Sequence, residues 1–137
     1  MAKESKDLQR LAVCKGRGSS TVRLLEADEF LALARTATAA LEWPTRESCN
    51  AQDWSLEQIK LWCSQWSPLF KNDSAALWVD DRCGISIAYD EAMQFLDELW
   101  FPSADDLFII SSDGLAVLFI DHEEQISLHQ PKLLAGG

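Results

Sequence analysis

The spacing of apolar residues along the chain predicts three helices. Apolar side chains recur every three or four positions over 28–40, which predicts a first helix that the Trp-Pro dipeptide after it stops. Ser55, followed three positions later by Gln58, has the pattern of a capping box and predicts a second helix over 55–67. A third helix is predicted over 90–100, where apolar and acidic side chains fall on opposite faces.

Short runs of β-branched, aliphatic and aromatic residues predict hairpins. Residues 75–79 and 85–89 flank a segment rich in turn formers. Residues 107–110 and 115–120 flank an Asp-Gly dipeptide, which favours the positive φ angle that a tight hairpin needs. A further hairpin is predicted over 8–25, where glycine and serine residues separate two short apolar runs.

Together these elements predict an α+β fold. The polar segment 44–53 is expected to be a loop, and 122–128 to be either a short helix or a strand. The order of elements favours an antiparallel sheet of four to six strands built from hairpins, with about three helices packed on it. We expect 1–137 to form a single domain with flexible tails over 1–7 and 131–137.

The composition favours a globular protein with an acidic surface. Of the 137 residues 47% are hydrophobic, which is enough to build a core and argues against a disordered chain. Twelve Lys and Arg residues stand against 22 Asp and Glu residues, for a formal net charge of -10. This balance argues against binding of a nucleic acid through its phosphates and favours a basic protein as the partner.

The sequence also favours a cytoplasmic protein. The first residues are charged and lack the apolar stretch of a secretory signal, and no apolar run approaches the ~20 residues that span a bilayer. The four cysteines have no C-x-x-C spacing, so buried or idle thiols are favoured over a zinc or redox site. They are Cys14, Cys49, Cys63 and Cys83. We expect no cofactor and no membrane partner.

Charge is distributed unevenly along the chain. Residues 1–23 hold six bases against two acids, whereas residues 76–124 hold one base, Arg82, against twelve carboxylates. Two interpretations stay open at this point. A basic N-terminal segment can lie on an acidic globule, or the acidic half can attract a basic partner.

Acidic pairs recur at predicted turns and strand ends. Strand ends can gather at one edge of a small sheet, where their carboxylates would speed association with a basic protein. Alternatively, each pair simply solubilises a loop or caps a helix. The candidate partner-binding residues are Asp80, Asp81, Asp105, Asp106, Asp121, Glu123 and Glu124.

No motif for catalysis stands out. The chain has no G-x-S-x-G sequence and no glycine-rich phosphate loop. Histidine and carboxylates meet at Asp121, His122 and Glu123, which could supply an acid/base pair or a metal ligand set but with few ligands. We therefore predict a non-enzymatic protein and assign no catalytic, cofactor-binding or metal-binding residues.

Four features occur together in the segment 99–126: the Trp100-Phe101-Pro102 turn, the Asp105-Asp106 pair, the hairpin around Asp113-Gly114 and the trailing His122-Glu123. In this combination the segment resembles the C-terminal half of small cytosolic immunity proteins from bacterial toxin systems. The resemblance implies an α+β protein that binds and blocks a cognate toxin domain. The alternative is an acidic secretion chaperone or adaptor, a class that is usually dimeric and holds an unfolded effector segment. The sequence leaves the oligomeric state open.

Overall fold

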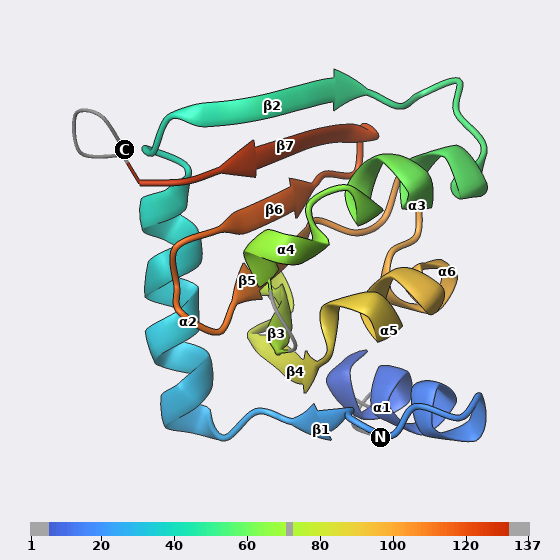
Figure 1. Ribbon diagram of the computed structural model, residues 1–137. Coiled ribbons are helices and arrows are strands. Elements are labelled where there is room, and N and C mark those ends of the chain that lie inside the picture. The colour runs from blue at the N-terminus through green and yellow to red at the C-terminus, as the bar shows by residue number, and fades with distance from the viewer. Residues whose placement is uncertain (1–5, 71–72, 132–137) are drawn as a thin grey trace.

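The structure is a computed structural model that describes residues 6–70 and 73–131 (Figure 1). The described residues form seven strands and six α-helices. In chain order these are α1 (Lys6–Gly16), β1 (Arg23–Leu24), α2 (Ala27–Ala40), β2 (Thr45–Asn50), α3 (Leu56–Ser64), α4 (Ser67–Phe70), β3 (Ser74–Trp78), β4 (Cys83–Ile87), α5 (Tyr89–Gln94), α6 (Leu96–Leu99), β5 (Leu107–Ser111), β6 (Val117–Ile120) and β7 (Gln125–His129). A short 3-10 turn, η1 (Val79–Asp81), joins β3 to β4.

The predicted α+β class is confirmed, with more strands and helices than expected. The strands form one antiparallel sheet in the order β1-β4-β3-β5-β6-β7-β2. The two hairpins predicted in the second half are present as β3–β4 and β5–β6, and Gly114 adopts the expected positive φ of 72° in the second turn. Residues 125–129 form a strand, which decides between the two alternatives for that segment.

Two predicted local structures are wrong. The hairpin expected over 8–25 is instead helix α1 followed by the two-residue strand β1. The loop expected over 44–53 contains strand β2, which pairs with β7. Because β2 is an edge strand and almost all of its residues are exposed, it lacks the apolar alternation that marks a half-buried strand.

The predicted helices at 28–40 and 55–67 correspond to α2 and α3, and both capping-box hydrogen bonds of Ser55 and Gln58 are formed. The predicted third helix is divided into α5 and α6 at Phe95, whose φ of -105° departs from helical geometry. The ring of Phe95 is buried there, so packing sets the break.

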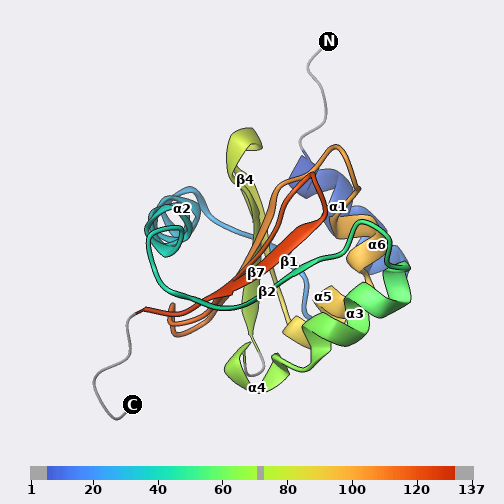
Figure 2. The same ribbon diagram turned by 90° about the horizontal axis from the view of Figure 1, so that it is seen from above.

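The two faces of the sheet are covered very differently (Figure 2). Helix α2 lies alone on one face, whereas α1, α3, α5 and α6 lie on the other. Since β1 and β2 are the two edge strands, α2 connects opposite edges of the sheet across that face. The lone helix packs through Phe30, Ala37 and Ala40 on a small apolar cluster.

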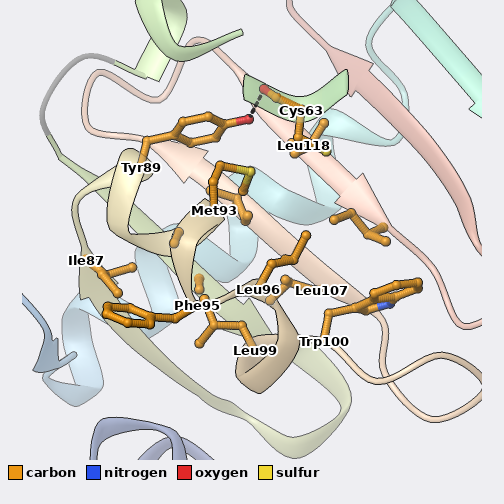
Figure 3. Packing of buried hydrophobic residues seen from close by; sticks show 14 of the residues in the cluster. Cys63, Ile87, Tyr89, Met93, Phe95, Leu96, Leu99, Trp100, Leu107 and Leu118 are labelled. Atoms are coloured by element: carbon orange, nitrogen blue, oxygen red, sulfur yellow. Dashed lines mark hydrogen bonds between the residues drawn. The ribbon is translucent and has the colours of Figure 1, made fainter. Parts of the chain in front are cut away.

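The larger core lies between the sheet and the remaining helices (Figure 3). Tyr89, Met93 and Leu96 point into it from α5 and α6, and the Tyr89 hydroxyl donates a hydrogen bond to the Cys63 carbonyl at 2.7 Å. Trp62 and Trp66 form an edge-to-face pair, with ring centroids 5.8 Å apart, that packs against this core. The helical spacing of these two tryptophans predicts that contact.

Within the described residues the four cysteines form no disulfide bond, and burial raises the pKa of the Cys14 thiol to about 11. Within 6–70 and 73–131, no helix has the length and apolar character needed to cross a membrane. The tails predicted over 1–7 and 131–137 lie largely outside the described residues, although Lys6 and Asp7 belong to α1.

Candidate functional site

The antiparallel register brings four connecting segments to one end of the sheet. At this end β2, β3 and β6 finish, and β4, β5 and β7 begin. The segments 51–55, 79–82, 100–106 and 121–124 therefore lie at the same end, and we call this region the acidic end. All seven candidate residues belong to these segments, so the gathering of acidic pairs that the sequence suggests does occur.

Asp80 and Asp81 lie in the turn between β3 and β4, and both are exposed. Arg82 ends this turn in the left-handed conformation, with φ of 53°, which fixes the direction in which the chain enters β4. The two carboxylates thus project from a short, well-defined turn.

Asp105, by contrast, is buried, with 2% of its surface exposed. Its carboxylate accepts a hydrogen bond of 2.8 Å from the backbone N–H of Phe101 and lies 3.7 Å from the guanidinium of Arg10. The Arg10 guanidinium also sits 4.6 Å above the Phe101 ring. Asp105 therefore attaches α1 to the turn before β5 and is not part of an exposed binding surface.

Asp106 links the start of β5 to the turn between β6 and β7. Its Oδ1 accepts a hydrogen bond from the backbone N–H of His122 and also lies 2.9 Å from the His122 ring Nδ1. The side-chain hydrogen bond between Asp106 and the His122 ring, together with the negative charge of Asp106, raises the pKa of His122 above its ordinary value. The side chain of Asp106 remains about one third exposed, at 32%.

The turn between β6 and β7 is built by Asp121. Its Oδ1 accepts hydrogen bonds of 2.9 Å from the backbone N–H groups of both Glu123 and Gln125. Glu124 is half-buried and has a positive φ of 65°, and its carbonyl accepts a hydrogen bond from Ala51. Glu123 is left exposed, with 69% of its side chain accessible.

Asp53 is an acidic residue of this end that the sequence interpretation missed. It is exposed and follows β2, and the neighbouring Gln52 side chain donates to the Glu123 carbonyl at 3.3 Å. Asp53 could have been placed at this end only if β2 had been predicted as a strand, because the pairing of β2 with β7 brings residues 51–55 to the acidic end.

An apolar groove adjoins the exposed carboxylates. Its volume is about 220 Å³, and it lies between the C-terminal half of α2 and the acidic end, on the face of the sheet that α2 alone covers. Phe108 and Phe119 contribute stacked rings with centroids 4.4 Å apart. The residues that line the groove are Thr38, Leu41, Val79, Asp80, Asp106, Phe108 and Phe119.

The basic N-terminal segment lies on a different part of the acidic half. Arg17 contacts Asp97 at 2.7 Å and Glu98 at 3.4 Å, with its guanidinium 5.0 Å from the Phe95 ring. For α1, therefore, basic side chains of the N-terminal segment do lie on the acidic part of the protein, as the first of the two interpretations of the charge distribution has it. Arg17 thus contacts carboxylates of α6, and Arg10 contacts the buried carboxylate of Asp105.

A larger cleft, of about 500 Å³, lies at the opposite end of the sheet between α2, β1 and β3. Three charged residues line it, Arg23, Glu29 and Asp73. The Arg23 guanidinium donates two hydrogen bonds of 2.9 Å to the Glu29 carboxylate. The hydrogen bond from Arg23 lowers the pKa of Glu29 to about 2. The guanidinium that lines the cleft is therefore already paired with a carboxylate of the protein itself.

Within the described ranges, His, Cys, Asp and Glu side chains do not gather in groups of three or more that could hold a metal ion. His122 meets Asp106 and lies 3.8 Å from Glu123, on the exposed surface of the turn. Comparison with protein-family models, with curated proteins and with solved structures gives no match.

Proposed function

We propose that this protein is a cytoplasmic immunity protein that neutralises a basic toxin domain by stoichiometric binding at the acidic end. The observation that supports the proposal is the convergence of exposed carboxylates from separate loops, Asp80, Asp81 and Glu123 among them, at one end of the sheet. Residues 76–124 hold only one base, so the field there is strongly negative.

The two parts of this surface have different physical roles. Exposed carboxylates accelerate the encounter with a basic protein and contribute modestly to the lifetime of the complex. Tight inhibition also needs a few desolvated contacts near the centre of the interface. The apolar groove beside Asp80 and Asp106 supplies such a place, because Phe108 and Phe119 form its floor.

The test begins with the partner. The tagged protein is purified from its native host with whatever it binds, and the recovered toxin domain is expressed, folded and mixed with the protein. A one-to-one complex, together with loss of the toxin's lethality when both are produced in one cell, is the result expected. Failure to protect the cell, with a folded toxin domain that forms no complex, contradicts the proposal.

The acidic end is then tested by paired neutralisation. Asp80→Asn with Glu123→Gln is compared with Asp73→Asn with Asp90→Asn, two exposed carboxylates at the opposite end of the sheet, before β3 and after β4. Both variants change the net charge by the same amount. Association measured at low salt should slow about three- to tenfold in the first variant only, with a weaker dependence on salt. Equal rates in the two variants would place the interface elsewhere.

A secretion chaperone or adaptor is the second candidate, and strand β2 favours it. This six-residue edge strand pairs with β7 on one side, and an extended segment of another protein could pair with the other side. A homodimer in light-scattering measurements that holds an unfolded effector segment would support this function. A monomer that binds a folded toxin domain would support immunity.

A further inference from the structure

The groove beside the acidic end has the size and the lining of a site for one side chain. Its volume of about 220 Å³ lies below the roughly 300 Å³ at which sites for drug-sized ligands begin. The floor is formed by stacked Phe108 and Phe119, and the carboxylates of Asp80 and Asp106 stand at the rim. An apolar floor with acidic groups at one side suits a long side chain that ends in a cation.

The protein builds this combination elsewhere with its own arginines. Arg10 lies 4.6 Å above the ring of Phe101 with its guanidinium 3.7 Å from the Asp105 carboxylate. The same grouping of guanidinium, phenylalanine ring and carboxylate therefore forms within one chain, and it fixes α1 to the turn before β5.

A second example lies at the other end of α1. The Arg17 guanidinium is 5.0 Å from the Phe95 ring and 2.7 Å from the Asp97 carboxylate. A guanidinium suits such a place because it is planar, stacks on aromatic rings and forms charge-assisted hydrogen bonds with carboxylates.

The groove contains the ring and the carboxylates of this grouping, but the described part of the chain places no Lys or Arg side chain in its lining. Arg82, the base next in sequence to this turn, lines a separate pocket with Leu25 and Phe30. The contacts of His122 with Asp106 are made to Oδ1, and Asp80 shows no ion pair within 6–70 and 73–131. The negative charge at the rim is therefore available to a partner.

We propose that this groove binds an arginine side chain of the partner protein, with the guanidinium against Phe119 and the carboxylates of Asp80 and Asp106. This inference rests on the proposed function, because it names the group of the toxin domain that the acidic end receives. Arginine is favoured over lysine because a lysine ammonium is more strongly hydrated and cannot stack on the ring.

The test uses a small probe, so that it does not depend on the toxin. N-acetyl-arginine amide is titrated into the 15N-labelled full chain, and backbone amide shifts are followed by NMR. The matched probes are N-acetyl-citrulline amide, which has a similar shape without the charge, and N-acetyl-lysine amide. Saturable shifts at Val79, Asp80, Asp106 and Phe119 are expected for arginine, with affinity at least about fivefold lower for each of the other two.

Two variants assign the contacts. Asp80→Asn should weaken arginine binding about five- to tenfold, because it removes a charge-assisted hydrogen bond. The control Asp73→Asn, at the opposite end of the sheet, should leave binding unchanged. Phe119→Leu keeps the groove apolar and should reduce the preference for arginine over lysine. Shifts outside the groove, or equal affinity for arginine and citrulline, would overturn the inference. A toxin complex that forms normally in that case would leave the immunity proposal intact.

Discussion

The carboxylate of Glu91, in the first turn of α5, holds the segment that follows α1. The hydroxyls of Ser19, Ser20 and Thr21 all donate to it, those of Ser20 and Thr21 at 3.0 and 2.8 Å. Partial burial raises the pKa of Glu91, but these hydrogen bonds outweigh burial and lower the pKa to about 2. Glu91→Gln keeps the shape of the side chain and removes its charge, so it should destabilise the fold.

The pKa sets the size of the effect. A fall from 4.5 to about 2, at about 1.4 kcal/mol per pH unit, corresponds to an upper limit of about 3 kcal/mol. Since Glu91 is partly exposed, solvent screening reduces this, and we expect roughly 1.5 kcal/mol for Glu91→Gln near neutral pH. Because the pKa is lower in the folded state, this stability is present above about pH 4.5 and is lost as the pH falls towards 2.

Urea unfolding, followed by tryptophan fluorescence, measures how far the free energy of unfolding of Glu91→Gln lies below that of the wild-type protein, at about pH 7 and about pH 3. Asp90→Asn is the control, since it lies in the same helical turn and accepts one hydrogen bond, from Ser67 at 2.9 Å. The control should cost about 0.5 kcal/mol. A Glu91→Gln effect no larger than the control, or one that does not shrink at low pH, would refute the reasoning.

Two further predictions concern the sheet and its acidic end. Gly84→Ala should cost about 2 kcal/mol in thermal or urea unfolding, because its Cβ would lie 2.9 Å from the Ala76 carbonyl oxygen, whereas Gly16→Ala, with open space around the Cβ, should have little effect. Asp106→Asn should lower the pKa of His122, measured by NMR titration. The variant should also reduce the stability that protonated His122 contributes at low pH, which the wild-type protein loses as the pH rises through the pKa of His122 in the folded state. An unchanged pKa of His122 would contradict the assigned contact with Asp106.

The parts of the fold that the sequence predicts are those set by local chemistry. Ser55 and Gln58 cap α3, and Gly114 turns the chain between β5 and β6, because neighbouring residues alone decide these structures. Helix α1 was missed because its position depends on distant contacts, such as that of Arg17 with Asp97. Strand β2 was missed because backbone pairing with β7, rather than side-chain pattern, makes it a strand.

The candidate site follows the same division. Acidic pairs at strand ends could be read from the sequence, and antiparallel pairing brings them together. The burial of Asp105 could not be predicted, because its ion-pair partner Arg10 lies far from it in the sequence and reaches it only once α1 has packed. The groove was also missed, since it exists only where α2 leaves Phe119 partly uncovered on the sheet.

The path of α2 from one edge of the sheet to the other has a consequence for synthesis. The chain makes β1, α2 and β2 before any of the five inner strands, and β2 pairs only with β7. During synthesis on the ribosome, both edge strands therefore lack their pairing partners until the strands between them have been made. Such non-local pairing slows folding, so the sheet is completed late. A nascent chain stalled before β7 exposes β2 to pairing with other chains.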